Sequence, residues 1–427
     1  MTTIVDIGMP RLSDSMEEAT VSKWLKRPGD AVSRGDELVE VETDKATVVY
    51  EAEQAGVLEE IVVDDGQTAA LGAPIARLRV TGDAPASSPP PPEKARAAPV
   101  VLEAPAGTRV LEFREALREA LDEELGRDER VILFGEDVAL AGGVFAVTPG
   151  LAEKHGPARV FDTPISELAM TGAAYGAAIT GLRPVLEIMF GDFLALSMDS
   201  LINQATKYWF LTGGKQSAPL VIRSVVGAGG RFGAIHSQMP VSWLMGIPGL
   251  KIVAPATPAD AKGLLKAAIR DENPVVFLEH KRLYPLKGEV DGAAMELGRA
   301  QVVRAGSDVT LVSAMKGVHD CLAAADRLAE QGVQAEVVDL RTIRPVDIET
   351  VLASVVKTHR VAVVEEGPLT GGWAGEVLAL VTERGLGDLD DAWRIATPDL
   401  PIPYSPPLED AFLPGPERIA DEVLARS

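Results

Sequence analysis

A stretch rich in proline and alanine divides this chain of 427 residues into two parts that have to fold separately. It runs from Thr81 to Gly107 as TGDAPASSPPPPEKARAAPVVLEAPAG. Such a composition cannot form a hydrophobic core, and four successive prolines favour extended polyproline II, which would span about 80 Å over the whole stretch. We therefore predict a flexible linker over residues 81–107, which lets a small domain, residues 1–80, swing relative to the rest.

Residues 1–80 contain a weak internal repeat. The segments TVSKWLKRPGDAVSRGDELVEVE and GVLEEIVVDDGQTAALGAPIARL share an order of glycine and apolar residues. The recurring residues of the first half are Gly29, Gly35, Leu38 and Val41, and those of the second half are Gly66, Gly72, Ile75 and Leu78. Two such halves predict a small, quasi-symmetric β-sandwich with glycines at its turns.

The crossover between the two halves carries Lys45, in VETDKATVVYEA. The flanking residues read as two strands joined by a turn, which places the lysine at a hairpin tip. Polar tips are common, so an ordinary surface lysine is one interpretation. Because this tip lies at the symmetric position of a domain on a long linker, the other interpretation is a lysine that carries a working group.

From Thr108 onward the sequence alternates between strands and helices. RVILFG, ARVFD, PLVIRSVV and LKIVAP are typical of buried strands, and LEFREALREALDEEL, AMTGAAYGAAITG, LSMDSLINQATKYWF and PADAKGLLKAAIRD are typical of helices. This order predicts a doubly wound parallel sheet in a domain over residues 108–285. A second α/β set, from DVTLVSA to GGWAGEVLALVTERG, predicts another domain over residues 286–427.

Two acidic residues follow strands of the first α/β domain. Glu136 in LFGEDVA comes directly after one strand, and Glu167 in FDTPISELAMTGAA follows another, at a helix start. Open α/β sheets bind their ligands at the carboxyl ends of the strands. The small residues after Glu167 allow close helix packing, which would bury its carboxylate and raise its pKa. The alternative is an ordinary acid at a helix N-terminus, beside Ser166 as N-cap.

The glycine-rich loop VVGAGGRFGAIHSQM carries His236, one of five histidines in the chain. A mobile loop with a group that titrates near neutrality suits proton delivery, although most loop histidines are neither bases nor ligands. The loop does not match the dinucleotide fingerprint, because Phe232 stands where its third glycine would be, so we do not expect NAD to bind. The sequence also lacks Walker, serine-nucleophile, zinc and GDG-type magnesium motifs.

Charge and hydropathy narrow the range of partners. The formal charge of −22 argues against nucleic acids and anionic membranes, and residues 1–80 alone carry 16 acidic against 8 basic side chains. The single cysteine, Cys321, excludes an internal disulfide framework. No apolar run approaches the length of a membrane span and no basic, apolar leader precedes the first strand, so we expect a bacterial cytoplasmic protein.

Residues 1–80 resemble a lipoyl domain along their whole length, in MPRLSDSMEEATVSKWLKRPGD, GDELVEVETDKA and EAEQAGVLEEI. The resemblance implies a small all-β flattened barrel in which Lys45 carries lipoate through an amide. Biotin carriers share this shape but have methionines beside their lysine, whereas Asp44 and Ala46 flank Lys45 here. Lipoate, attached by a lipoate ligase, is therefore the favoured modification.

From about Arg109 to the end, the chain resembles the β subunit of the decarboxylating component of 2-oxo acid dehydrogenase complexes. The matching motifs include GEDVA, DTPISE, GLRPVLEIMF, HSQMPVSW, IPGLKIVAP and DLRTIRPVD. The resemblance implies a transketolase-like pyrimidine-binding domain, a transketolase C-terminal-like domain and an α2β2 heterotetramer. It further implies that this chain binds the pyrimidine half of thiamine diphosphate, while the α subunit holds the diphosphate through magnesium. The missing GDG motif agrees with that division.

The resemblance also assigns site residues. Glu167 matches the glutamate that hydrogen-bonds the aminopyrimidine ring and promotes its imino form. Glu136 matches an acid of a buried relay between paired sites, His236 the histidine near the substrate, and Phe193 an aromatic residue near the pyrimidine. The segment AAIRDENP matches a potassium-binding turn, although an ordinary helix cap has the same features. The candidate potassium ligands are Leu220, Ala268, Ile269, Asp271 and Asn273.

The family implies oxidative decarboxylation of a 2-oxo acid, with the acyl group passed to lipoate on the way to acyl-CoA. An acyltransferase core and a dihydrolipoyl dehydrogenase are implied partners, although the lipoyl domain usually belongs to the acyltransferase. MFGDF, GGVFAVTPG and EHKRLYPLKGEV favour a pyruvate- or acetoin-type subunit over a branched-chain one. Two other classes stay open. A self-contained transketolase-like synthase is disfavoured by the missing magnesium motif, and a non-catalytic lipoyl carrier is disfavoured by the presence of Glu167 and His236.

Overall fold

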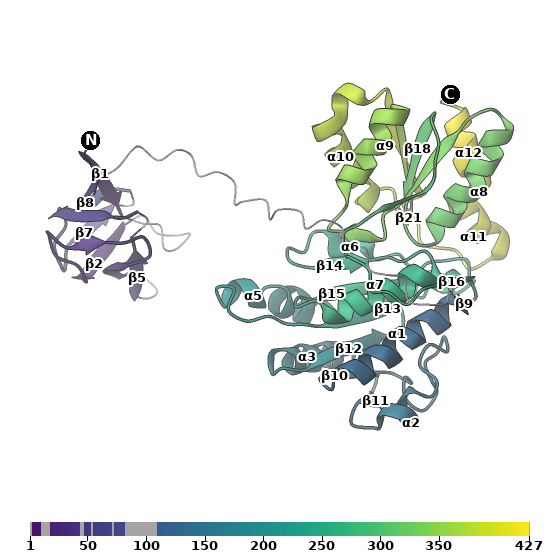
Figure 1. Ribbon diagram of the computed structural model, residues 1–427, viewed down its shortest axis with the longest axis horizontal. Coiled ribbons are helices and arrows are strands. Elements are labelled where there is room, and N and C mark those ends of the chain that lie inside the picture. The colour runs from purple at the N-terminus through teal and green to yellow at the C-terminus, as the bar shows by residue number, and fades with distance from the viewer. Residues whose placement is uncertain are drawn as a thin grey trace. The chain divides into compact units, whose positions relative to one another are not determined.

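The computed structural model describes residues 2–9, 18–42, 47–52, 54–70, 72–81 and 109–426. These residues belong to two compact units, Met1–Val101 and Leu102–Ser427 (Figure 1). The linker predicted over residues 81–107 lies outside the described residues, apart from Thr81 at the end of a strand.

The first unit is built from antiparallel strands. They are β1 (Thr2–Gly8), β2 (Glu18–Trp24), β3 (Ala31–Val32), β4 (Glu37–Glu42), β5 (Thr47–Glu51), β6 (Gly56–Ile61), β7 (Thr68–Ala70) and β8 (Pro74–Thr81). They form two four-stranded sheets, in the orders β1-β8-β6-β3 and β5-β4-β2-β7. Residues of both sheets share one apolar core, as expected of a small sandwich that the sequence predicted.

The internal repeat is confirmed in the first unit. All four of its glycines have a positive φ, between 75° and 98°, a backbone conformation that glycine adopts without strain. Equivalent glycines make equivalent bonds, since Gly29 donates to Leu58 O and Gly66 donates to Val21 O, each at 2.7 Å. The four apolar residues of the repeat are all buried in the shared core. The repeat therefore encodes turns and core together.

The second unit begins with an α/β domain. Its strands are β9 (Arg109–Glu112), β10 (Val131–Gly135), β11 (Val160–Asp162), β12 (Arg183–Ile188), β13 (Val221–Val226), β14 (Lys251–Val253), β15 (Val275–His280) and β16 (Lys287–Val290). Its helices are α1 (Phe113–Arg127), α2 (Leu151–His155), α3 (Glu167–Ile179), α4 (Leu194–Asp199), α5 (Tyr208–Leu211), α6 (Val241–Met245) and α7 (Pro258–Arg270), with the 3₁₀ helices η1 (Gly191–Phe193) and η3 (Lys281–Leu283) and the π-helix η2 (Ser200–Ala205).

The main sheet of this domain has the strand order β11-β10-β12-β13-β15-β14-β20, and its first six strands are parallel. The predicted parallel sheet is confirmed, but two of its strands, β12 and β15, were not among the predicted ones. The helix predicted over residues 196–210 is broken into α4, η2 and α5. The π-helical turn packs against α3, where a Cβ on Gly172 would lie 3.4 Å from Ser200 Oγ. Such tertiary packing is not encoded in the local helical pattern.

The second α/β domain follows. Its strands are β17 (Gln301–Arg304), β18 (Val309–Ser313), β19 (Ala335–Asp339), β20 (Thr342–Arg344), β21 (Arg360–Pro368) and β22 (Asp391–Thr397). Its helices are α8 (Lys316–Glu330), α9 (Ile348–Thr358), α10 (Trp373–Gly385), α11 (Pro406–Phe412) and α12 (Pro416–Leu424), with the 3₁₀ helix η4 (Leu386–Asp388). Five strands form a sheet in the order β17-β19-β18-β21-β22, with α9 and α10 on one face and α8 and α12 on the other (Figure 1).

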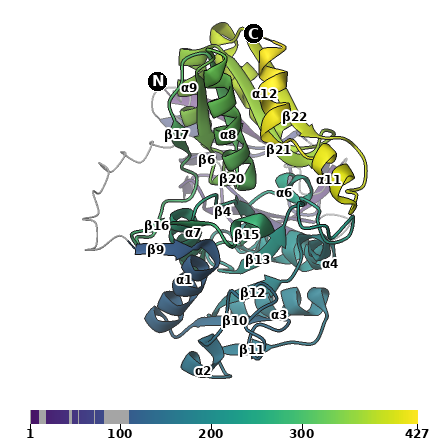
Figure 2. The same cartoon turned by 90° about the vertical axis from the view of Figure 1, so that its right-hand side faces the viewer.

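A shared strand joins the two α/β domains. The short strand β20, labelled in Figure 2, leaves the second domain. It pairs antiparallel with β14 at the edge of the first domain's sheet. The domains therefore share backbone hydrogen bonds as well as side-chain contacts. Across the residues that the structure describes, no helix has the length and apolar character that a membrane span requires.

A buried arginine ties the three central strands of the first domain together. Arg223 of β13 is 1% exposed. Its guanidinium donates to Glu187 of β12 at 2.6 Å and to both carboxylate oxygens of Glu279 of β15, at 2.7 and 2.9 Å. Tyr284 adds an O–H bond to Glu279 at 2.8 Å. Because the charges are desolvated together, these bonds fix the side chains and the strands that carry them.

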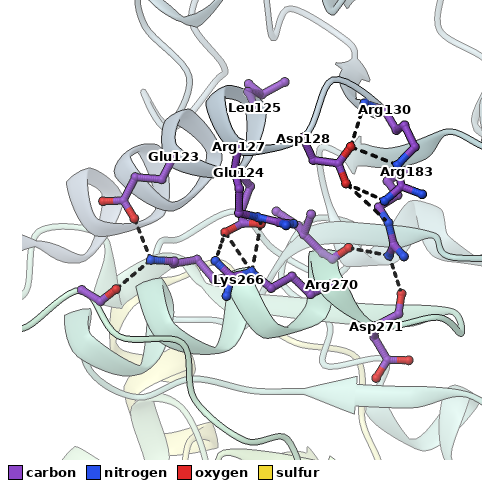
Figure 3. A network of polar contacts seen from close by, with 12 residues as sticks. Glu123, Glu124, Leu125, Arg127, Asp128, Arg130, Arg183, Lys266, Arg270 and Asp271 are labelled. Atoms are coloured by element: carbon purple, nitrogen blue, oxygen red, sulfur yellow. Dashed lines mark hydrogen bonds and ion pairs between the residues drawn. The ribbon is translucent and has the colours of Figure 1, made fainter. Parts of the chain in front are cut away.

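A ladder of ion pairs joins α1 to α7 (Figure 3). Basic residues one turn apart on α7 face acidic residues of α1 at 2.5–2.8 Å: Lys262 with Glu119 and Glu123, Lys266 with Glu123, and Arg270 with Glu124. Glu124 is fully buried and also binds Arg127 at 2.7 Å. An acid in this position needs both guanidinium groups to offset its desolvation.

We expect Glu124→Gln to lower the free energy of unfolding by about 1–3 kcal/mol, because the amide places N–H donors against the donors of Arg127 and Arg270. Calorimetric melting of the full chain measures the change. Glu129→Gln is the matched control, since Glu129 is exposed and has no ion pair or hydrogen bond among the described residues. Equal melting temperatures for the two variants would contradict a stabilising role for the buried acid.

Candidate active site

The two acids singled out in the sequence lie at the carboxyl-terminal edge of neighbouring strands. Glu136 directly follows β10, and Glu167 begins α3, after β11. Because β10 and β11 pair in parallel, both connections leave the same edge of the sheet. Glu136 is 9% exposed and Glu167 is 6% exposed. The predicted burial of the Glu167 side chain is thus confirmed.

Within the described residues, neither Glu136 nor Glu167 has a side-chain hydrogen bond or an ion pair. Burial raises the pKa of Glu136, and the charges of Glu167 and Asp137 raise it further. Glu136 and Glu167 are therefore within electrostatic reach of each other. Buried acids without partners are costly, and they are found where a ligand completes the bonds.

The start of α3 also bears on the helix-cap interpretation of Glu167. The Ser166 side chain makes no capping hydrogen bond. Glu167 lies in the first turn, where a carboxylate interacts favourably with the helix dipole, so this interpretation stays open on geometry alone. Its burial goes beyond that role, since an exposed acid stabilises a helix end equally well.

An aromatic cluster surrounds His236. The His236 ring meets Phe190 edge to face at 4.6 Å and Phe193 at 5.5 Å between centroids. Phe190 and Phe193 contact each other at 5.9 Å. The structure thus brings together the predicted Phe193 and His236, and α4, which begins just after Phe193, packs against α3.

Three residues near this cluster were missed in the sequence. Phe190 is the main contact of His236, although it stands beside Phe193 in the segment FGDF. Asp192 of the same segment accepts a bond from Gln238 Nε2 at 2.9 Å, while its other oxygen is buried and has no hydrogen-bond partner among the described residues. Lys281 donates to the main-chain carbonyl of His236. No local pattern marks Lys281, because its contact is formed across 45 residues.

The glycine loop comprises residues 227–238, and side chains of the second α/β domain bind its first residues. Glu409 of α11 accepts a hydrogen bond from Gly229 N at 2.9 Å. Glu366 of β21 accepts from Ala228 N and binds His280 at 2.8 Å. The nearby charges of His280 and Lys281, with these hydrogen bonds, hold the pKa of Glu366 below its usual value although burial opposes the shift. The loop that carries His236 is thus built by both domains.

Four of the five predicted potassium ligands lie in one turn at the end of α7, and the fifth, Leu220, directly precedes β13. Several of their oxygen atoms already have protein donors, and Figure 3 shows Asp271 within this network. Arg183 Nη1 donates to the carbonyls of Ile269 and Asp271, each at 3.1 Å. The Asp271 carboxylate binds Lys251 and accepts from Asn273 N at 2.9 Å. Leu220 O accepts from Val275 N at 2.9 Å. These bonds agree with a satisfied helix end, and the potassium site stays a prediction.

The residues present fit the pyrimidine half of thiamine diphosphate. Its aminopyrimidine needs a carboxyl partner and an aromatic or apolar surface. The site offers Phe193 and Glu167, whose carboxylate has no partner among the described residues. The predicted lipoyl attachment site, Lys45, lies outside the described residues.

Known protein families match all three domains. Residues 5–78 match the family model described as "Biotin-requiring enzyme". Residues 109–287 match "Transketolase, pyrimidine binding domain", and residues 298–419 match "Transketolase, C-terminal domain". A solved structure, "Split gene transketolase, inactive beta4 tetramer", is similar with a TM-score of 0.63 and 21% identity, over 74% of this chain and 97% of that one. That likeness supports the fold alone.

Three similar proteins of known function are all β subunits of a dehydrogenase or an oxidoreductase. "Pyruvate dehydrogenase E1 component subunit beta" of Rhizobium meliloti (strain 1021) is 42% identical over 99% of both chains. "Acetoin:2,6-dichlorophenolindophenol oxidoreductase subunit beta" of Cupriavidus necator is 46% identical over 73% of this chain and 96% of its own length. "2-oxoisovalerate dehydrogenase subunit beta" of Bacillus subtilis is 44% identical over 73% and 96%. The chain therefore belongs to the family of E1 component β subunits of 2-oxo acid dehydrogenases, in the form that carries an N-terminal domain of the biotin/lipoyl type.

Proposed function

We propose that this chain is the β subunit of a pyruvate dehydrogenase, which decarboxylates pyruvate oxidatively and passes the acetyl group to lipoate for acetyl-CoA formation. The observation that carries the proposal is the buried Glu167, unpartnered among the described residues and beside Glu136 at the edge of a parallel sheet. The relative that matches over its full length, N-terminal domain included, supports pyruvate as the substrate.

We propose roles for the chain's own residues that their geometry supports. When bound, thiamine diphosphate supplies the carbon nucleophile that attacks a 2-oxo group and allows carbon dioxide to leave. Glu167 holds a proton at the ring nitrogen of the aminopyrimidine, because its carboxyl has no competing partner among the described residues. Glu136, with its raised pKa, is suited to exchange a proton with Glu167. Phe190 and Phe193 pack against the imidazole of His236, and we propose that this packing orients it toward the substrate.

The rest of the site belongs to other chains of the complex. As an E1 β subunit, this chain works with an α subunit. We propose an α2β2 heterotetramer in which the α subunit holds the diphosphate through magnesium. We further propose that Lys45 carries lipoate from a lipoate ligase and delivers the acetyl group to a dihydrolipoyl acyltransferase core in the bacterial cytoplasm, with dihydrolipoyl dehydrogenase reoxidising the lipoyl group.

Acetoin is the second candidate substrate. The acetoin relative is slightly more identical, at 46% against 42%, although it covers 73% of this chain against 99%. The test is to measure turnover of pyruvate, acetoin and 2-oxoisovalerate by the assembled enzyme, with dichlorophenolindophenol as electron acceptor. The kcat/KM values rank the three substrates. A higher kcat/KM for acetoin would replace pyruvate in the proposal.

We expect the isolated chain to decarboxylate none of these substrates, because half of the cofactor site is elsewhere. Activity should appear when the α subunit, thiamine diphosphate and magnesium are added. Carbon dioxide release from labelled pyruvate measures both preparations. Equal turnover by the isolated chain would exclude the split site.

Glu167→Gln should lower the decarboxylation rate of the assembled enzyme by about 10²–10⁴-fold, because an amide cannot hold and release a proton as a carboxyl does. Steady-state kinetics and a melting curve are recorded on one preparation. Glu153→Gln is the control, since Glu153 is also an acid in a first helical turn but is exposed. If both variants lose only about 1 kcal/mol of stability and keep full activity, Glu167 is merely a helix-end acid.

Lys45→Arg keeps the charge but cannot form the lipoyl amide. We expect decarboxylation with an artificial acceptor to persist, while acetyl-CoA synthesis by the whole complex falls, completely if this is its only lipoyl domain. Intact mass after treatment with lipoate ligase should show one lipoyl group on the wild type and on Lys26→Arg, and none on Lys45→Arg. Lys26 is a suitable control because it lies in the same unit and pairs with Asp36. An unmodified wild-type chain would make Lys45 an ordinary turn residue.

A further inference from the structure

The glycine loop is anchored at both ends, and His236 lies between the anchors. Glu366 and Glu409 of the second α/β domain bind its start. Asp192 binds its end, through Gln238 Nε2. The position of the imidazole therefore depends on what holds the middle of the loop.

The middle of the loop, residues 232–236, is joined to other segments of the described chain by one hydrogen bond. The Lys281 ammonium, at the start of η3, donates to the main-chain carbonyl of His236. Among the described residues, no other hydrogen bond joins residues 232–236 to a segment outside the loop. Without Lys281, this part of the loop keeps only van der Waals and aromatic contacts.

The surroundings of Lys281 are unusual for a cation. Its side chain is buried, with 7% of the residue exposed, and no carboxylate of the described residues pairs with it. The ammonium instead lies 5.1 Å from the Phe232 ring centroid and 5.6 Å from that of Phe190, within cation–π range. Phe190 is also the ring that packs against His236. Lys281 thus reaches the histidine through its carbonyl and through a shared aromatic neighbour.

Keeping a positive charge on Lys281 costs free energy of desolvation. Burial lowers the pKa of its ammonium from 10.5 to about 8, although the charges of Asp192, Glu366 and Glu409 oppose the shift. A methionine would fill a similar volume without that desolvation. The ammonium is useful here only for what a hydrocarbon cannot do, which is to donate a hydrogen bond and attract aromatic faces.

We propose that Lys281 is a positioning residue, which holds the His236 turn against Phe190 and so fixes the orientation of the imidazole. The anchoring of the loop stands on the contacts alone. Its kinetic consequence rests on the proposed function, in which His236 faces the substrate.

Hydrogen–deuterium exchange of the full chain, assembled with its α subunit, tests the anchoring directly. In Lys281→Met we expect amides of residues 232–238 to exchange about tenfold faster, since the variant loses a hydrogen bond from a charged donor. Lys281→Arg keeps a cation and its donors, and should restore protection to within about threefold of wild type. If Lys281→Met does not assemble with the α subunit, Lys281→Gln replaces it in the experiment, because a glutamine side chain is too short to reach the carbonyl.

Arg282→Met is the matched control. Arg282 is the next residue along the chain, is exposed, and donates to Gly229 O at 2.9 Å, where Glu409 also holds the loop. We expect its exchange over residues 232–238 to stay within about twofold of wild type, because the other anchors of the loop remain.

Kinetics of the same preparations give the second measurement. A looser histidine should lower kcat/KM for the 2-oxo acid about tenfold or more in Lys281→Met, with recovery in Lys281→Arg and little change in Arg282→Met. Unchanged exchange over residues 232–238 in Lys281→Met would overturn the proposal, as would equal acceleration in Lys281→Met and Arg282→Met. A wild-type enzyme without decarboxylase activity would reject the proposed function, while the exchange data would still decide the role of Lys281.

Discussion

The buried pairing of Arg223 with Glu187 and Glu279 is the interaction on which the site most depends. It ties β12, β13 and β15 at the centre of the sheet, and each of these strands leads into one part of the aromatic cluster. β12 leads to Phe190 and the helices after it, β13 to the glycine loop, and β15 to His280 and Lys281. Because the ion pairs tolerate little displacement in a desolvated interior, the three segments leave the sheet in a fixed relation.

The site is built by two domains that cannot be treated as independent modules. β20 extends the sheet of the first domain, and Glu366 and Glu409 reach from the second domain to main-chain N–H groups of the glycine loop. The second domain contributes no group assigned to the chemistry. Its contribution is geometric, since two of its acidic side chains bind main-chain N–H groups of the loop that carries His236.

The buried charged side chains around the site are of two kinds, those with an oppositely charged partner and those without one among the described residues. Glu187 and Glu279 are buried with a guanidinium, and their burial serves the architecture. Glu136 and Glu167 are buried with no side-chain partner in the described part of the chain, so their carboxylates can accept a hydrogen bond from another molecule. Lys281 is intermediate, because a carbonyl and two aromatic rings stand in for a counter-ion.

The sequence by itself determined the features whose physical cause is local. The repeat around Gly29 and Gly66 predicted both turns and core of the first unit, because left-handed turns demand glycine and strand alternation determines which side chains are buried. The alternation of strands and helices likewise predicted a parallel sheet and placed Glu136 and Glu167 at its carboxyl edge. Only the tertiary structure decided the rest. The strands β12 and β15 are buried at every residue although Glu187, Glu279 and His280 interrupt their apolar runs, and the acids tolerate burial because they pair with Arg223 of β13. The contacts of His236 with Phe190 and Lys281 join segments tens of residues apart, and no local pattern specifies which buried cation meets which carbonyl.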